Sequence, residues 1–84
     1  MAKRGWKKPL AVHAGRYGHI RFTVGSAVRA AEILIDHWPE RAKQGPEYTE
    51  ACRVCLACLS GECDAEAARK AFVAAAMEAD ILAD

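Results

Sequence analysis

The sequence predicts a small α+β domain in which an N-terminal β-hairpin packs on three α-helices, in the order β-β-α-α-α, as two layers. Residues 9–24 alternate between apolar and polar positions, which is typical of strands. Helical spacing of apolar residues follows over residues 27–38, and two further helical segments cover residues 47–60 and 65–82. A chain of 84 residues supports one small core, so we expect residues 1–84 to form a single domain.

The predicted hairpin turns at Gly15-Arg-Tyr-Gly18, between two alternating runs. Trp6 has the same parity as the apolar positions of the first run. The apolar positions are Leu10 and Val12 before the turn and Ile20, Phe22 and Val24 after it. An isolated two-stranded ribbon is marginal in water, so helices must cover its apolar face.

The three helices are delimited by residues that start or stop helices. Ser26 is an expected N-cap and Pro39 ends the first helix, whose buried face is Ala27, Ala31, Leu34 and Trp38. The second helix stops at Gly61, and Asp64 caps the third. The third helix is expected to bury Ala68, Phe72, Ala75 and Ala79.

The charge is unevenly distributed along the chain. Residues 1–29 hold seven basic and no acidic residues, whereas residues 30–84 hold five basic and eleven acidic ones. No apolar run approaches the roughly 18–20 residues that span a bilayer, and the basic start precedes an apolar stretch too short for a signal peptide. We therefore expect a cytoplasmic protein with no membrane partner.

The basic N-terminal segment has two interpretations. Residues 1–8 combine Lys3, Arg4, Lys7 and Lys8 with Trp6, a mixture that can meet phosphates and stack on bases. With Arg21, these cations make nucleic-acid binding the alternative function. A solvated tail that can be flexible is favoured, because no helix carries a clustered basic face and Trp6 is needed under the hairpin.

The four cysteines of the chain fall within twelve residues: Cys52, Cys55, Cys58 and Cys63. The favoured interpretation is core packing, with Cys52, Cys55, Leu56 and Leu59 on one buried helical stripe. The spacing Cys-x2-Cys-x2-Cys-x4-Cys also admits a zinc or iron–sulfur site, and Cys63, beside a helix N-terminus, is a candidate redox thiol. A reducing compartment argues against a disulfide. We predict no metal and no cofactor.

The third predicted helix carries a second apolar stripe, Val73, Met77 and Ile81, on the side away from Phe72. Ile33 is likewise isolated among charged residues. A small monomer seldom leaves such residues in water, so Ile33, Val73, Met77 and Ile81 are predicted to form an interface with a second copy. The alternative is a helix that is buried on two sides.

Several short motifs follow one another along the chain in a characteristic order: Trp6, Val24, Ala31, Leu34, His37-Trp38-Pro39, Ala51, Cys55, Leu59, Gly61, Ala68-Arg69, Ala71-Phe72, Ala75-Ala76 and Glu78-Ala79. Their order and spacing resemble a known family, the short alpha-proteobacterial proteins grouped as domain of unknown function family 982. The resemblance implies a small cytoplasmic α+β protein with no assigned activity, so no functional residue carries over. It implies a recurrent cysteine at Cys55 and no set of four.

No catalytic constellation is present in the sequence, so we predict that the protein is not an enzyme. The favoured function is a non-enzymatic, homodimeric interaction module, and the alternative is a nucleic-acid-binding protein. A cysteine-based metal or redox protein is the third interpretation. The residues do not select a small-molecule ligand or a biological process.

Overall fold

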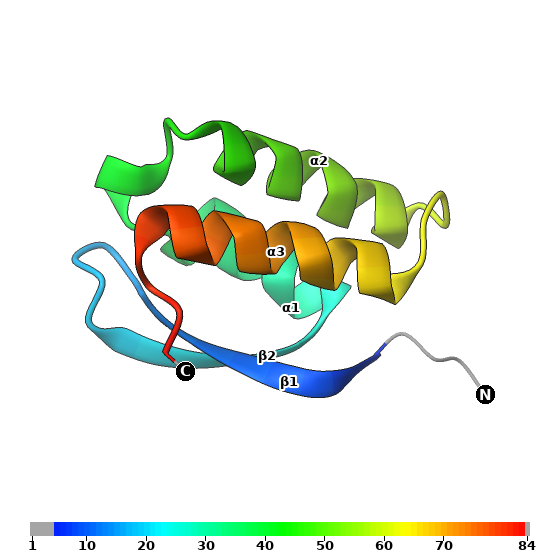
Figure 1. Ribbon diagram of the computed structural model, residues 1–84, viewed down its shortest axis with the longest axis horizontal. Helices are drawn as coiled ribbons and strands as arrows, with labels where there is room; N and C mark the ends of the chain where they lie inside the picture. Colours follow the sequence, from blue (N-terminus) through cyan, green and yellow to red (C-terminus); the bar gives the residue numbers. More distant parts are fainter. Residues whose placement is uncertain (1–4, 84) are drawn as a thin grey trace.

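The computed structural model describes residues 5–83 and places a β-hairpin beneath three helices (Figure 1). The strands are β1 (Gly5–Ala14) and β2 (Ile20–Ser26). The helices are α1 (Ala27–Glu32), its π-helical continuation η1 (Ile33–His37), the 3-10 turn η2 (Glu40–Ala42), α2 (Pro46–Leu59) and α3 (Ala65–Ala79). The predicted α+β class and the β-β-α-α-α order are confirmed.

The hairpin is antiparallel, with Leu10 opposite Val24 and Val12 opposite Phe22. Its turn depends on two glycines in the left-handed region, Gly15 at φ 86° and Gly18 at φ 76°, where a side chain would be strained. β1 begins at Gly5, so residues 5–8 belong to a strand rather than to a tail. Residues 1–4 of the predicted tail lie outside the described residues.

The C-terminal segment returns along the outer edge of β1 (Figure 1). The N–H of His13 donates to the carbonyl of Ile81 at 2.7 Å, and the N–H of Ala83 donates to the carbonyl of Ala11 at 2.8 Å. This pairing requires α3 to end earlier than predicted. It ends at Ala79, because Asp80 adopts a left-handed conformation (φ 58°) that turns the chain toward the sheet.

The core lies between the hairpin and the helices, with three aromatic rings at its centre. The ring of Phe72 on α3 lies 5.5 Å from Trp38, edge-on, and 5.8 Å from Trp6 on β1, centroid to centroid. Trp6 is therefore in the core, as its parity predicted. Within residues 5–83, neither indole N–H of these tryptophans has a hydrogen-bond acceptor.

The first helix follows its predicted limits closely. Ser26 caps it by accepting a hydrogen bond from the N–H of Arg29 at 3.2 Å, and Trp38 leaves the helix in an extended conformation before Pro39. The last five helical residues widen into the π-helical turn η1. In the described part of the chain, no helix is long and apolar enough to cross a membrane.

Candidate functional site

Two residues of the predicted interface lie in the core. Ile33 and Ile81 are at most 3% exposed, so the prediction that they stand outside the core is wrong. Ile33 is buried because α1 and η1 contact both the hairpin and α2. Ile81 leaves the helical pattern at Asp80 and packs beside β1. Helix burial on two sides, the alternative interpretation, thus applies to the first helix.

The other two residues of that stripe remain at least partly accessible on α3. Val73 is half-buried, whereas Met77 is 66% exposed. Of the four residues of the predicted interface, Met77 is therefore the only one that is more exposed than buried.

A larger apolar surface borders the junction of α1 and α2. Four aliphatic side chains there are between 40% and 56% exposed: Val28 and Ile35 from α1 and η1, and Leu56 and Leu59 from α2. We call these four residues the α1–α2 apolar surface. Sequence periodicity missed it because it assigned Leu56 and Leu59 to the core.

The contacts of the two helices place these four residues. The guanidinium of Arg29 lies over the ring of Phe22 at 5.4 Å, so that flank of α1 faces the hairpin. Val28 and Ile35 are seven residues apart and lie on one exposed side of the first helix, which contacts α2. On α2, the flank with Cys58 approaches the start of α3, whereas Leu56 and Leu59, three residues apart, lie on an exposed side of the helix.

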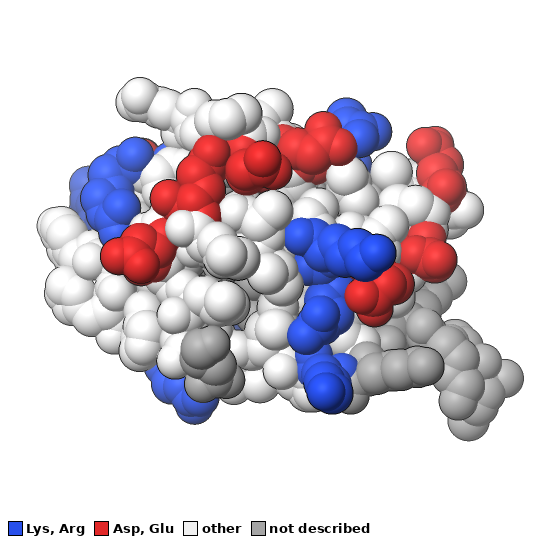
Figure 2. Space-filling view, viewed as in Figure 1, with Lys and Arg blue, Asp and Glu red and all other residues white. Residues whose placement is uncertain are grey.

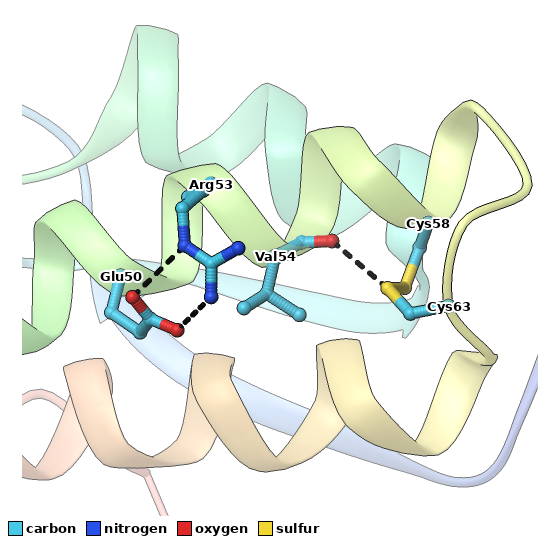
Figure 3. A network of polar contacts seen from close by, with 5 residues as sticks. All are labelled: Glu50, Arg53, Val54, Cys58 and Cys63. Atoms are coloured by element: carbon cyan, nitrogen blue, oxygen red, sulfur yellow. Dashed lines mark hydrogen bonds and ion pairs between the residues drawn. A yellow bond between two sulfur atoms is a disulfide. The ribbon is translucent and has the colours of Figure 1, made fainter.

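The cysteines divide into two free thiols and one disulfide. Cys55 is fully buried and Cys52 is half-buried against the core, which confirms core packing for these two. Cys58 and Cys63 form a disulfide, contrary to the expectation of four free thiols (Figure 3). Among the described residues, no group of three His, Cys, Asp or Glu side chains could hold a metal ion.

The buried stripe of α2 differs from the predicted one. It runs through Ala51 and Cys55, with Cys58 partly buried beside them, whereas Leu56 and Leu59 are exposed. The prediction of a Cys52, Cys55, Leu56 and Leu59 face is therefore correct only for the cysteines.

The disulfide closes a turn that backbone hydrogen bonds already define. The N–H of Glu62 donates to the carbonyl of Ala57 at 2.9 Å, and the N–H of Gly61 donates to the carbonyl of Cys58 at 3.0 Å. With Gly61 at φ 85°, these two bonds make the Schellman motif that ends α2. The sequence signal for this closure was Gly61, placed between Cys58 and Cys63.

Each sulfur of the disulfide also lies near a backbone carbonyl. The sulfur of Cys63 is 3.4 Å from the carbonyl oxygen of Val54 (Figure 3), and the sulfur of Cys58 is 2.9 Å from that of Asp64. Neither sulfur has a proton to donate in the disulfide, so each sulfur can hydrogen-bond to its carbonyl only as a free thiol. One turn earlier on α2, Arg53 binds the Glu50 carboxylate and lowers the pKa of that carboxyl group.

Two side chains of α2 have strongly raised pKa values. Burial raises the pKa of the Cys55 thiol to about 12, and the neighbouring Cys52 adds to the effect. Burial also raises the pKa of Tyr48 to about 12, with further contributions from a hydrogen bond to Cys52 and from the charge of Glu40. The Tyr48 hydroxyl donates to the carbonyl of Leu34 at 2.8 Å. Cys55 is therefore a poor nucleophile near neutral pH.

The basic residues of the nucleic-acid alternative are only partly described. Lys3 and Arg4 lie outside the described residues, as does the side chain of Lys7, whereas Lys8 and Arg21 are exposed. Arg69, which the sequence did not single out, donates from its Nε to the carbonyl of Lys8 at 3.3 Å. Figure 2 shows basic side chains gathered over part of α3 and β1, and carboxylates along α2.

Residues 8–83 match the model of a family described as "Protein of unknown function (DUF982)". The match covers nearly the whole chain and confirms the resemblance that its motifs indicated. No curated protein and no solved structure matches the chain.

Proposed function

Because this chain belongs to the DUF982 family, whose description names no activity, we propose a function from its structure: a non-enzymatic module that forms a homodimer through the α1–α2 apolar surface. The observation that carries this proposal is the exposure of Val28, Ile35, Leu56 and Leu59 along one helix junction. Because α1 and η1 contact α2, these four exposed side chains lie on neighbouring helices, and covering them is favourable.

The charged residues beside this surface favour a second copy as the partner. On α1, Arg29 pairs with Glu32 at 2.7 Å, and on α2, Arg53 pairs with Glu50. Both pairs are neutral overall, so they add no like-charge repulsion between two identical surfaces. In a two-fold dimer, the helix pair of one chain would pack on that of the other as a four-helix arrangement.

The size of the molecule is compatible with this arrangement. A stable interface buries about 800 Å² on each partner. That is a modest part of the 5210 Å² accessible surface of the chain. Four aliphatic side chains would supply its centre, and the two neutral ion pairs would lie at its rim.

Sedimentation of the parent protein and two matched variants tests the proposal. Leu56→Lys is expected to yield a folded monomer, because a lysine at the centre of the interface would lose its hydration. Met77→Lys places the same charge on the exposed side of α3 and is expected to leave the dimer intact. A monomeric parent protein would overturn the proposal. If Met77→Lys were monomeric and Leu56→Lys dimeric, the interface would lie on α3 instead.

Nucleic-acid binding is a second candidate, supported by the contact between Arg69 and Lys8. Two adjacent cationic residues can contact successive phosphates of one strand. The expected result is binding of a single-stranded oligonucleotide whose affinity falls steeply with added salt and falls further in Arg69→Ala. Binding that does not change with salt would contradict this function.

A further inference from the structure

We propose that Cys58 and Cys63 form a reversible dithiol–disulfide pair that exchanges with low-molecular-weight thiols and disulfides of the glutathione class. The proposal is independent of the dimer. It rests on the way the backbone holds the two cysteines, on the groups that face their sulfurs and on the contrast with the other two cysteines.

The backbone holds Cys58 and Cys63 together whether or not their sulfurs are bonded. Their Cα atoms are 4.6 Å apart, across the turn that the Schellman hydrogen bonds of Gly61 and Glu62 close. On the far side of Cys63, Asp64 caps α3 by accepting a hydrogen bond from the N–H of Ala67 at 3.0 Å. These bonds do not involve sulfur, so the disulfide can open without unfolding the turn.

The surroundings of the sulfurs suit the reduced state as well as the oxidised one. After reduction, the thiol of Cys63 can donate to the carbonyl of Val54 and the thiol of Cys58 to that of Asp64. Each thiol thus has a hydrogen-bond acceptor without having to move. Both carbonyls are backbone groups of the helices, Val54 within α2 and Asp64 at the N-cap of α3, so they keep their positions in either redox state.

The exchange reaction balances as two successive substitutions at sulfur. The thiolate of Cys63, which lies in the turn, attacks a small-molecule disulfide, forms a mixed disulfide and releases one thiolate. The thiolate of Cys58, which packs against the core, then attacks the Cys63 sulfur and releases the second. The dithiol loses two electrons and two protons, and one small-molecule disulfide becomes two thiols.

The remaining cysteines do not compete for this chemistry. Cys55 is fully buried and its pKa is raised to about 12, so it supplies little thiolate. Cys52 is one turn of helix N-terminal to Cys55 and contacts Tyr48, away from the Gly61 turn. The geometry therefore confines exchange to a single pair.

Equilibration of the protein with glutathione buffers of graded redox potential, followed by alkylation of free thiols and intact mass measurement, tests the proposal. We expect two species that differ by two alkylated thiols, with a transition inside the buffered range. Cys52→Ala should leave this transition unchanged. Cys63→Ala should abolish it and leave at most a mixed disulfide with glutathione.

Two outcomes would overturn the proposal. In the first, the chain stays oxidised even in the most reducing buffer, which would make the disulfide structural. In the second, peptide mapping places the disulfide on Cys52 or Cys55. Circular dichroism of the reduced parent protein provides the second readout, because retention of the helical signal is expected if the turn forms without the disulfide.

Discussion

The carboxylate of Glu78 on α3 occupies the space beside Gly45 that a side chain at position 45 would fill. From there it caps the N-terminus of α2. The two oxygens of its carboxylate accept hydrogen bonds from the N–H groups of Glu47 and Tyr48, each at 3.2 Å. Gly45 is the N-cap residue of α2 and offers no side chain of its own. A Cβ at position 45 would overlap the Glu78 carboxylate. The capping function has thus moved to a neighbouring helix.

Gly45→Ala is therefore expected to destabilise the protein although its φ of −76° is ordinary for alanine. The added methyl would displace Glu78 and expose two donors, at a cost of about 1 kcal/mol in the free energy of unfolding. Glu78→Ala should cost a similar amount, and the double variant should cost less than the sum. Urea denaturation measures all three. Gly25→Ala is the control, because no atom lies within 4 Å of a Cβ there. An equal loss at both glycines would contradict the capping role.

Truncation of Phe72 should cost a large part of the stability of the domain. It is fully buried between Trp6 and Trp38, and replacing a buried phenylalanine by alanine costs about 3–5 kcal/mol. That is a large share of the stability of so small a domain. Tryptophan fluorescence during urea denaturation should show a much lower unfolding midpoint for Phe72→Ala than for the parent protein. Tyr17→Ala, at a ring that is 75% exposed, should leave the midpoint nearly unchanged.

Ile81 and Met77 should respond in opposite ways to the same truncation. Ile81→Ala removes a buried side chain beside β1 and is expected to cost about 2–4 kcal/mol. Met77→Ala removes an exposed one and should change stability by less than about 0.5 kcal/mol. Thermal denaturation of the two variants under identical conditions measures the difference. Equal losses of stability in the two variants would contradict the different burial of Ile81 and Met77.

The sequence predicted the elements well because their boundaries depend on local chemistry. Ser26 and Asp64 cap helices through their own side chains, and Gly61 ends α2 in the left-handed conformation that favours glycine. The alternation of Leu10, Val12, Phe22 and Val24 likewise predicted the two strands without any tertiary information. Ile20, which the same alternation assigned to the covered face, is 57% exposed.

The sequence was less informative about which side of a helix is buried. On α2, the small residues Ala51, Cys55 and Cys58 face the core while Leu56 and Leu59 remain exposed, because α3 packs close to the small side chains. Hydrophobicity alone favours the leucines. Ile81 is buried because the left-handed conformation of Asp80 turns the chain toward the sheet. The first helix is buried on two sides because the hairpin packs against it as well as α2.

Tyr48 and Cys55 should make the protein unstable in alkaline solution. Burial raises the pKa of Cys55 from 9.0 to about 12 and that of Tyr48 from 10.0 to about 12. Between these values the unfolded chain has lost protons that the folded chain retains, so the free energy of unfolding falls as pH rises. The contribution of both groups is fully present below pH 9 and is lost as pH rises toward 12. Urea denaturation at a series of pH values should show a midpoint that falls above pH 9.

Variants assign this loss to the two groups. Tyr48→Phe removes the hydrogen bond to the carbonyl of Leu34, so it should lower stability at every pH while flattening the alkaline decline. Cys55→Ala should flatten the decline as well, because alanine has no proton to lose. If the stability of each variant fell as steeply with pH as that of the parent protein, titration of exposed amines and phenols would explain the alkaline loss. In that case burial on α2 would not control the alkaline limit of the fold.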